Sequence, residues 1–386
     1  MLRFFAKNLK EFYLQREVFY IAGYDPKSYR FYYDLFKNNL KAYSAQFKLK
    51  THMSKIEKNE LFPFFNISCE EAQTKYHFLT WNDIVKKNWS QNYKDALADC
   101  YSFFRIYAVS GLFIKFGKES IYQLITGFYP FFYVLFSLLF SLGLALGSFV
   151  FLQNHTHFVL ALIIGVFLGF LLNHFLFKLG KKLAVFWIAR ICAFCATWQE
   201  KKKGLMDERI VLFANTIVRS LKANATQEPY ELILVAHSVG SIVCIEVLEC
   251  ILRQNLEPSL LNKLKILTLG ECIPLTSYQK KADEFRKKLE FVSRFDLKWY
   301  DYTSIIDGAC FPQVDFFRTS GVEAKFTPLF LNPKFHTLYE KNAYKKIKRD
   351  KNKAHFLYLY SVGIKGDYDF FAFIVKPKFL EEKVKI

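Results

Sequence analysis

The sequence predicts a mixed α/β fold, with a mostly parallel sheet covered by helices on both faces and interrupted by a hairpin of two membrane-spanning helices. Short apolar runs typical of buried strands alternate with helical segments on both sides of the chain's middle. Two long uncharged stretches lie between these flanks. Because neither flank has a full set of strands, we expect one α/β domain formed by residues 1–120 and 196–386, with a hairpin insertion at 121–195.

The first flank begins with an apolar run at residues 18–22, which predicts a buried strand. Asp25 before Pro26 is typical of a helix start, so we expect a helix from Pro26. Further strands are expected at 45–49 and 76–81, followed by a helical segment over 92–120 that leads into the membrane.

Two uncharged stretches, residues 128–152 and 158–177, predict the hairpin. Each is long enough to cross a hydrocarbon core of roughly 30 Å as a helix. Lys115 and Lys118 precede the first stretch and basic residues follow the second, whereas the connection at 153–157 contains no Lys or Arg. The positive-inside rule therefore places both termini in the cytoplasm, with the α/β domain on the cytoplasmic side of the inner membrane.

Each predicted span contains a GxxxG spacing, at Gly143 and Gly147 and at Gly165 and Gly169. Such spacings allow close helix approach, either within the hairpin or between chains of a homo-oligomer. The next segment, residues 183–198, is apolar but too short to span, and we expect it to lie along the membrane interface.

The second flank continues the alternation of helices and strands. Helical spacing is present over 205–224, and a second helix is expected from Ser241. Strands are expected at 231–236, 264–269 and 297–302.

The chain has a formal net charge of +19, with 54 Lys and Arg against 35 Asp and Glu. This charge suits an anionic lipid bilayer, and nucleic acid is the competing partner. The basic residues are scattered along the sequence, so we expect no nucleic-acid partner.

The eight cysteines have no disulfide-like spacing, and the single CxxC at Cys192 and Cys195 lies in an apolar run. We expect these two thiols to be packing residues rather than metal ligands.

The sequence LILVAHSVGS, residues 232–241, predicts a strand that turns abruptly into a helix at Ser238. This arrangement is the nucleophile elbow, in which a strained turn exposes the Ser hydroxyl. Ala236 and Gly240 are the small residues that let the strand and the helix approach. The helix N-terminus adds partial positive charge where an oxyanion would form, and the N–H of Val239 is the first expected donor.

With this elbow the chain resembles serine hydrolases of the α/β-hydrolase superfamily, of the lipase and esterase kind, and is most similar to bacterial membrane-associated members. The motif has Ala236 where Gly is commoner. The weaker matching pieces, which cover most of the chain outside the hairpin, are VFYIAGYDP at 18, WNDIV at 81, DERIVLFA at 207, WYDYTSIIDGACFP at 299 and HFLYLY at 355.

The resemblance implies an acid that follows the elbow in a loop after a late strand, and a His that comes last. Asp307 fits the acid and is preferred over Asp301, which lies inside the predicted strand. His355 opens an apolar run that resembles the family's last strand, and it is preferred over His336 as the base.

The resemblance also places a second oxyanion donor in the loop after the first strand, here the Gly23 and Tyr24 backbone. His237, just before the nucleophile, is expected to pack rather than to catalyse. The implied activity is cleavage of an acyl ester or thioester, including lipid esters, through an acyl-enzyme, with no metal or organic cofactor. The competing hypotheses are a non-catalytic membrane scaffold or transport-associated protein, and a channel or transporter.

Overall fold

The computed structural model describes residues 13–89, 93–198 and 205–385 of the chain. The chain divides into two compact units. The first, here called the α/β unit, comprises Met1–Trp89 and Thr197–Ile386, and the second, the hairpin unit, comprises Ser90–Ala196. The helical segment before the spans therefore groups with the hairpin rather than with the α/β unit.

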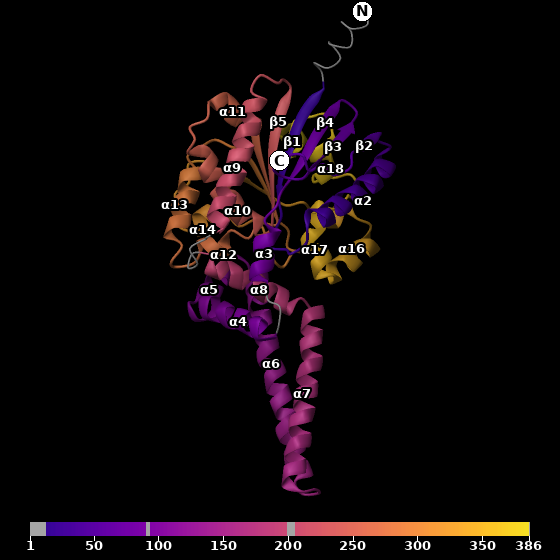
Figure 1. Ribbon diagram of the computed structural model, residues 1–386, viewed down its shortest axis with the longest axis vertical. Coiled ribbons are helices and arrows are strands. Elements are labelled where there is room, and N and C mark those ends of the chain that lie inside the picture. The colour runs from indigo at the N-terminus through magenta and orange to yellow at the C-terminus, as the bar shows by residue number, and fades with distance from the viewer. Residues whose placement is uncertain (1–12, 90–92, 199–204, 386) are drawn as a thin grey trace, which may run out of the picture. The chain divides into compact units, whose positions relative to one another are not determined.

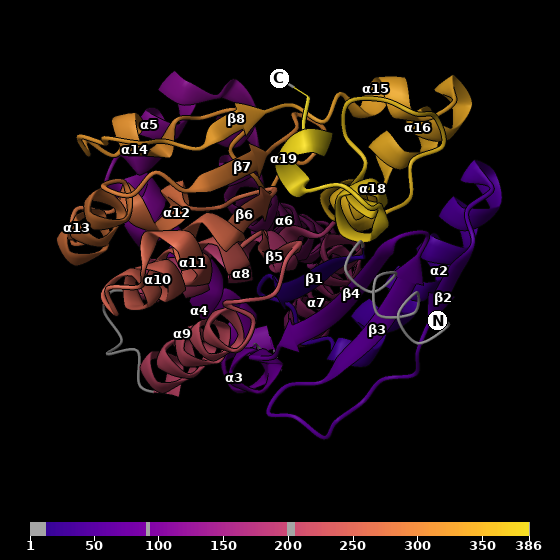
Figure 2. The ribbon, with the colours of Figure 1, turned by 90° about the horizontal axis from the view of Figure 1, so that it is seen from above.

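The α/β unit contains an eight-stranded sheet in the order β2-β3-β4-β1-β5-β6-β7-β8 (Figures 1 and 2). Only β3 runs against its neighbours, so the predicted mostly parallel sheet is confirmed. The carboxyl ends of the parallel strands share one edge, here called the carboxyl edge. The strands are β1 Leu14–Ile21, β2 Thr51–Met53, β3 Phe64–Cys69, β4 Ala72–Leu79, β5 Tyr230–His237, β6 Leu264–Leu269, β7 Lys298–Tyr302 and β8 Leu329–Leu331.

Helices cover both faces of the sheet, and Figure 2 shows α9 and α10 on the side opposite α16 and α18. Every residue of β5 is buried, as expected for a strand covered on both faces. The helices of the unit are α2 Tyr29–Phe47, α3 Asn82–Asn88, α9 Leu205–Ala223, α10 Gly240–Leu252, α11 Pro258–Lys263, α12 Pro274–Ser277, α13 Asp283–Val292, α14 Phe316–Thr319, α15 Phe335–Leu338, α16 Lys341–Arg349, α17 Lys351–Phe356, α18 Phe370–Val375 and α19 Leu380–Lys383.

Two local predictions in the first flank are wrong. The helix expected from Pro26 begins at Tyr29 instead, because the Asp25 carboxylate accepts the Lys27 N–H and closes a turn before the helix. The strand expected at 45–49 is the end of the same helix. Tyr43 is buried and its ring contacts that of Phe47 at 4.7 Å, which extends the helical packing into this segment.

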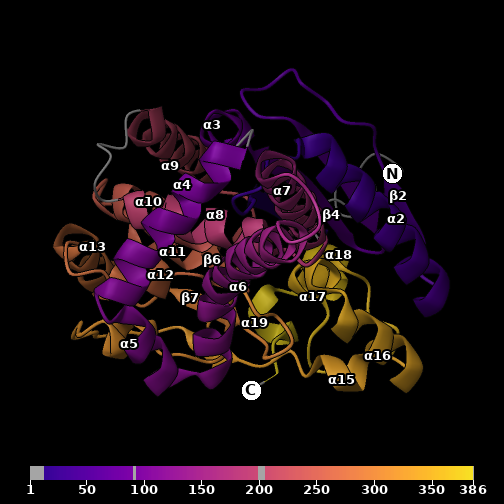
Figure 3. The same ribbon diagram turned by 90° about the horizontal axis from the view of Figure 1, so that it is seen from below.

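The hairpin unit contains two helices that are long and apolar enough to span a membrane, α6 Ile121–Leu152 and α7 Phe158–Lys182. Figures 1 and 3 show them side by side. The predicted pair of spans is confirmed in length and apolar composition. The expected helix over 92–120 is broken into α4 Tyr93–Phe103, the π-helical turn η1 Phe104–Val109 and α5 Leu112–Glu119, with a 71° bend. If that bent pair crosses as one span, the chain has up to three.

The glycines of the two GxxxG spacings differ in how closely other atoms pack against them. A Cβ atom on Gly165 would lie 2.6 Å from the Ala145 carbonyl oxygen, and one on Gly169 would lie 2.8 Å from the Ser141 carbonyl oxygen. Around Gly143 and Gly147 no atom of the described residues lies within 4 Å of such a Cβ. Close packing of the hairpin therefore depends on the glycines of α7.

The apolar segment expected at the interface forms α8, Val185–Thr197. Its one charge, Arg190, lies 3.6 Å from Asp99 of α4, and the Cys192 carbonyl accepts a hydrogen bond from the Tyr107 hydroxyl at 3.2 Å. Cys192 and Cys195 are buried free thiols, and burial raises the pKa of each. These contacts pack α8 against the preceding helices of its own unit.

Candidate active site

Ser238 occupies a strained turn between β5 and α10. Its φ is +56°, a left-handed conformation that a residue with a side chain rarely adopts. A Cβ atom on Gly240 would lie 2.6 Å from the Ile21 carbonyl oxygen, so only glycine allows α10 to start this close to β1. Ala236 is fully buried in β5. The local geometry matches the elbow that the sequence predicts.

Hydrogen bonds on several sides hold this turn. The Ser238 N–H donates to the Leu269 carbonyl at 2.9 Å, and the Ser238 carbonyl accepts from the Ser241 hydroxyl at 2.6 Å. That hydroxyl in turn accepts the Cys272 N–H at 3.1 Å. The strained conformation is therefore fixed by β6 and the loop after it, which is how strain at a functional site persists.

His355 and Asp307 meet at the carboxyl edge. His355 Nδ1 lies 2.9 Å from Asp307 Oδ1, and both side chains are almost fully buried. Asp307 Oδ1 also accepts the Ala309 N–H at 3.0 Å, which fixes the carboxylate. An imidazole whose Nδ1 donates to a carboxylate has its other ring nitrogen, Nε2, as the acceptor.

The two less favoured residues lie elsewhere. Asp301 is buried inside β7, where its carboxylate accepts from the Thr268 hydroxyl at 2.6 Å. His336 is exposed on α15. The structure thus brings His355 together with Asp307 and leaves both alternatives out of this pair.

The expectation that His355 opens a strand is wrong, because His355 lies in the last turn of α17, followed by a 3-10 turn at Leu357–Leu359. His355, Phe356 and Tyr358 are all buried there. An apolar run that is buried on every side has no strand alternation to distinguish it from a buried helix.

His237 connects His355 to the turn at Ser238. Its Nε2 donates to the His355 carbonyl at 3.0 Å, and the two imidazole rings lie 4.7 Å apart. Burial, together with the charge on His355, lowers the pKa of His237 to about 3. His237 is therefore neutral at pH values near 7. Since His237 directly precedes Ser238, this bond holds the His355 backbone beside the nucleophile.

Gly23, which follows β1, lies against Ser238. A Cβ atom on Gly23 would lie 2.9 Å from Ser238 Cβ and 3.3 Å from Ser238 Oγ. Tyr24 is buried, and its hydroxyl donates to the Asn88 carbonyl at 2.9 Å. Val239 precedes the first turn of α10, where helix amides have no partner within the helix. Of the expected oxyanion residues, Gly23 lies against the Ser238 hydroxyl, and Val239 follows Ser238 at the start of α10.

Sequence reasoning missed two residues beside the elbow, Ser241 and Cys272. Cys272 Sγ lies 3.6 Å from Ser238 Oγ and 3.2 Å from the Ala309 carbonyl oxygen. Cys272 follows the carboxyl end of β6 by three positions. Since parallel strands end at one edge, its position after the neighbouring strand is the signal that could have found it.

Two buried carboxyl groups lie behind this edge. Burial, and then the charge of Asp301, raises the pKa of Glu271 well above its usual range, and burial raises the pKa of Asp301 to about 7. Glu271 accepts the Ile273 N–H at 2.7 Å and so shapes the loop that carries Cys272. Both carboxyl groups are fully buried.

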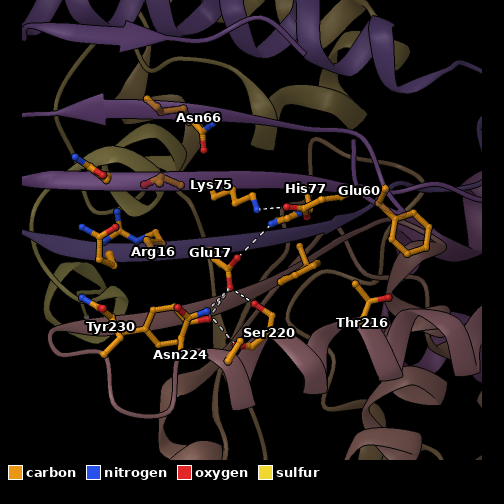
Figure 4. Close-up of a pocket in the computed structure, with 18 of the residues that line it drawn as sticks. Arg16, Glu17, Glu60, Asn66, Lys75, His77, Thr216, Ser220, Asn224 and Tyr230 are labelled. Atoms are coloured by element: carbon orange, nitrogen blue, oxygen red, sulfur yellow. Dashed lines mark hydrogen bonds and ion pairs between the residues drawn. The ribbon is translucent and has the colours of Figure 1, made fainter. Parts of the chain in front are cut away.

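A polar hollow of about 760 Å³ lies over β1, β4 and α9 (Figure 4). Glu17 accepts from the Tyr230 hydroxyl at 2.8 Å, and His77 Nε2 lies 3.4 Å from the same carboxylate. Burial raises the pKa of Glu17, but the hydrogen bonds from His77, Ser220 and Tyr230 outweigh it and lower the pKa. Glu17 pairs in register with Leu232, in the middle of β1 and β5, so the hollow lies away from the carboxyl edge.

Among residues 13–89, 93–198 and 205–385, no group of three or more His, Cys, Asp or Glu side chains could hold a metal ion. Comparison of the chain with models of protein families, with curated proteins and with solved structures finds no match. The function is therefore inferred from the geometry around Ser238.

Proposed function

We propose that the chain is a membrane-anchored serine hydrolase with the α/β-hydrolase fold, which cleaves an acyl ester or thioester, including lipid esters. One observation carries the proposal. Ser238 is held in a left-handed turn at the carboxyl edge, where His237 ties it to the backbone of His355, and His355 is bound to Asp307 at 2.9 Å. A Ser, Asp and His that meet at one edge in this chain order are the parts of an acyl-transfer site.

In the proposed reaction, His355 Nε2 accepts the Ser238 proton as Ser238 Oγ attacks the acyl carbonyl carbon. Asp307 holds the imidazole tautomer through Nδ1 and stabilises the imidazolium. The amides of Val239 and of the Gly23 and Tyr24 loop stabilise the oxyanion. The imidazolium then protonates the leaving group, and His355 activates a water that releases the acyl group and restores Ser238.

The hairpin supports a role at a membrane. Two apolar helices in one chain would keep the site near lipid-embedded substrates. Lys115 and Lys118 before the spans and Lys181 and Lys182 after them favour a cytoplasmic orientation, whereas residues 153–157 have no Lys or Arg. The substrate proposed on this basis is an ester that partitions into the cytoplasmic leaflet.

The proposal is tested by labelling the full chain in isolated membranes with a serine-reactive fluorophosphonate probe. We expect labelling of wild type, no labelling of Ser238→Ala, and labelling slowed about 10²–10⁴-fold in His355→Ala, because the general base is lost. The matched control is His336→Ala, which removes an exposed His and should label like wild type. A folded wild-type protein that does not react would favour a non-catalytic membrane scaffold instead.

A further inference from the structure

The α/β unit has one strongly basic helical surface, formed by α16 and the start of α17. Over residues 341–353 there are seven basic residues and one acidic residue, Asp350. We call this set the basic surface. All seven basic side chains are exposed. The set comprises Lys341, Lys345, Lys346, Lys348, Arg349, Lys351 and Lys353.

The basic residues of α16 share one face of the helix. Ile347 is buried and anchors the opposite face to the core, with Tyr344 half-buried one turn earlier. At about 100° per residue, the five basic residues of α16 fall on the arc opposite Ile347. Ile347 fixes one side of α16 to the core, so basic residues that are scattered along the sequence gather on the exposed side of this helix.

Ion pairs between described residues do not neutralise this positive charge. None of the seven basic side chains has a carboxylate within ion-pair distance among the described residues, unlike Lys334 and Lys385, which both contact Asp367. The Asp350 carboxylate accepts the Lys353 N–H at 3.0 Å and so caps α17. A concentrated charge without a partner in the chain is typical of a surface that binds an anionic partner.

The basic surface is continuous with the catalytic base, because α17 ends in His355 and Phe356. It therefore lies at the carboxyl edge, and Figure 1 shows α16 and α17 at the same end of the α/β unit as α3.

We propose that the basic surface binds a bilayer through anionic phospholipid headgroups and so presents the carboxyl edge to lipid esters. Clusters of Lys and Arg on one face of an amphipathic helix bind anionic leaflets in this way. Charge complementarity and the two apolar helices of the same chain favour a bilayer over nucleic acid as the partner. Binding of the bilayer by the basic surface does not depend on the proposed function. Only the statement that the bound lipid surface supplies the substrate rests on that function.

The test uses the full chain in nanodiscs of phosphatidylcholine alone or with about one third phosphatidylglycerol. Hydrogen–deuterium exchange of residues 341–353 is measured in both, at low and at high salt. We expect exchange to slow severalfold in the anionic discs at low salt and to recover at high salt, because salt screens the attraction. The double variant Lys341→Glu/Lys345→Glu should abolish this difference.

The matched control is Lys37→Glu/Lys41→Glu on α2. These lysines are also exposed, also four positions apart, and have no ion-pair partner among the described residues. Because α2 starts near the carboxyl edge and runs away from it, this variant should keep the lipid-dependent protection. Equal protection in neutral and anionic discs, or equal loss in both double variants, would overturn the proposal. Protection by a short DNA duplex in neutral discs that exceeds protection by the anionic lipid would also overturn it.

A catalytic arm separates this proposal from the proposed function. Hydrolysis of a bilayer-embedded fluorogenic ester should be faster in anionic discs for wild type and for the α2 variant, but not for Lys341→Glu/Lys345→Glu. Fluorophosphonate labelling in neutral discs should be the same for all three proteins. Lipid-dependent protection without any labelling would support the binding surface and reject the hydrolase. Labelling without lipid-dependent protection would support the hydrolase and reject the binding surface.

Discussion

His237 Nε2 donates a 3.0 Å hydrogen bond to the carbonyl of His355, so the residue before the nucleophile holds the backbone of the proposed base. The two residues are far apart in the sequence but adjacent at the carboxyl edge. The sequence analysis expected His237 to pack only. Its neutral, fully buried imidazole gives it the additional task of fixing the position of His355.

Replacing His237 tests this positioning role. His237→Leu removes the donor and leaves the His355 carbonyl buried without it, and we expect fluorophosphonate labelling to slow about ten- to hundredfold. His237→Gln keeps an N–H donor and should restore most of the rate. Because the pKa of His237 is about 3, the Gln variant should also keep the shape of the pH–rate profile above that value. Equal rates for the Leu and Gln variants would contradict the role.

A methyl group on Gly23 should damage the oxyanion site. The added Cβ would lie 2.9 Å from Ser238 Cβ and 3.3 Å from its Oγ, so the Gly23 loop must move away from the nucleophile. Losing one oxyanion donor costs about 10²–10³-fold in rate, and we expect ester hydrolysis by Gly23→Ala to fall by about 10²-fold. Gly363→Ala is the control, because its Cβ would meet its nearest neighbour at 3.4 Å, an ordinary contact. Similar activity in both variants would rule out close approach of Gly23.

The hairpin provides a pair of matched glycine variants. Gly169→Leu would force its side chain against the Ser141 carbonyl oxygen and the Ala145 Cβ, each 2.8 Å from the Cβ position. We expect a loss of about 1–3 kcal/mol in the free energy of unfolding, from overpacking. Gly143→Leu faces open space in the described chain and should leave stability unchanged. Thermal unfolding of the full chain in mild detergent measures both, and destabilisation by Gly143→Leu would instead indicate packing between chains.

Asp301 should make stability depend on pH. Burial raises its pKa to about 7 in the folded chain, above a usual value near 3.9 for an unfolded one. The folded state therefore binds more protons between these values, and stability from this group falls as the pH rises through that window. Relative to Asp301→Asn, wild type should lose up to about 1.4 kcal/mol per pH unit between about pH 4 and 7, and no more above it. Unfolding scans at several pH values check this, and a difference that does not change with pH would contradict it.

The strong local signals predicted the centre of the fold. β5 and β6 are continuous apolar runs that end at turn residues, and the elbow between β5 and α10 is encoded within ten positions. The spans α6 and α7 follow from length and hydrophobicity alone. These elements need no information about distant parts of the chain.

The missed elements depend on distant partners. β2 has three residues, and β3 is held by antiparallel pairing to β4, so neither has a distinctive pattern of its own. Cys272 and Ser241 join the site only because β6 lies beside β5. The contact between His237 and His355 likewise requires the complete sheet, since α17 returns to the carboxyl edge only after β8 is added.

The most direct test of the central claim is detection of an acyl-enzyme on Ser238. The full chain in detergent is mixed with a p-nitrophenyl ester, quenched with acid within its first turnovers, and analysed by intact and peptide mass spectrometry. The account predicts a mass increase equal to one acyl group, located on the peptide that contains Ser238 and absent in Ser238→Ala. Two results together would contradict this prediction: a folded wild-type chain hydrolyses the ester without an adduct on Ser238, and the Ser238→Ala variant hydrolyses it equally fast.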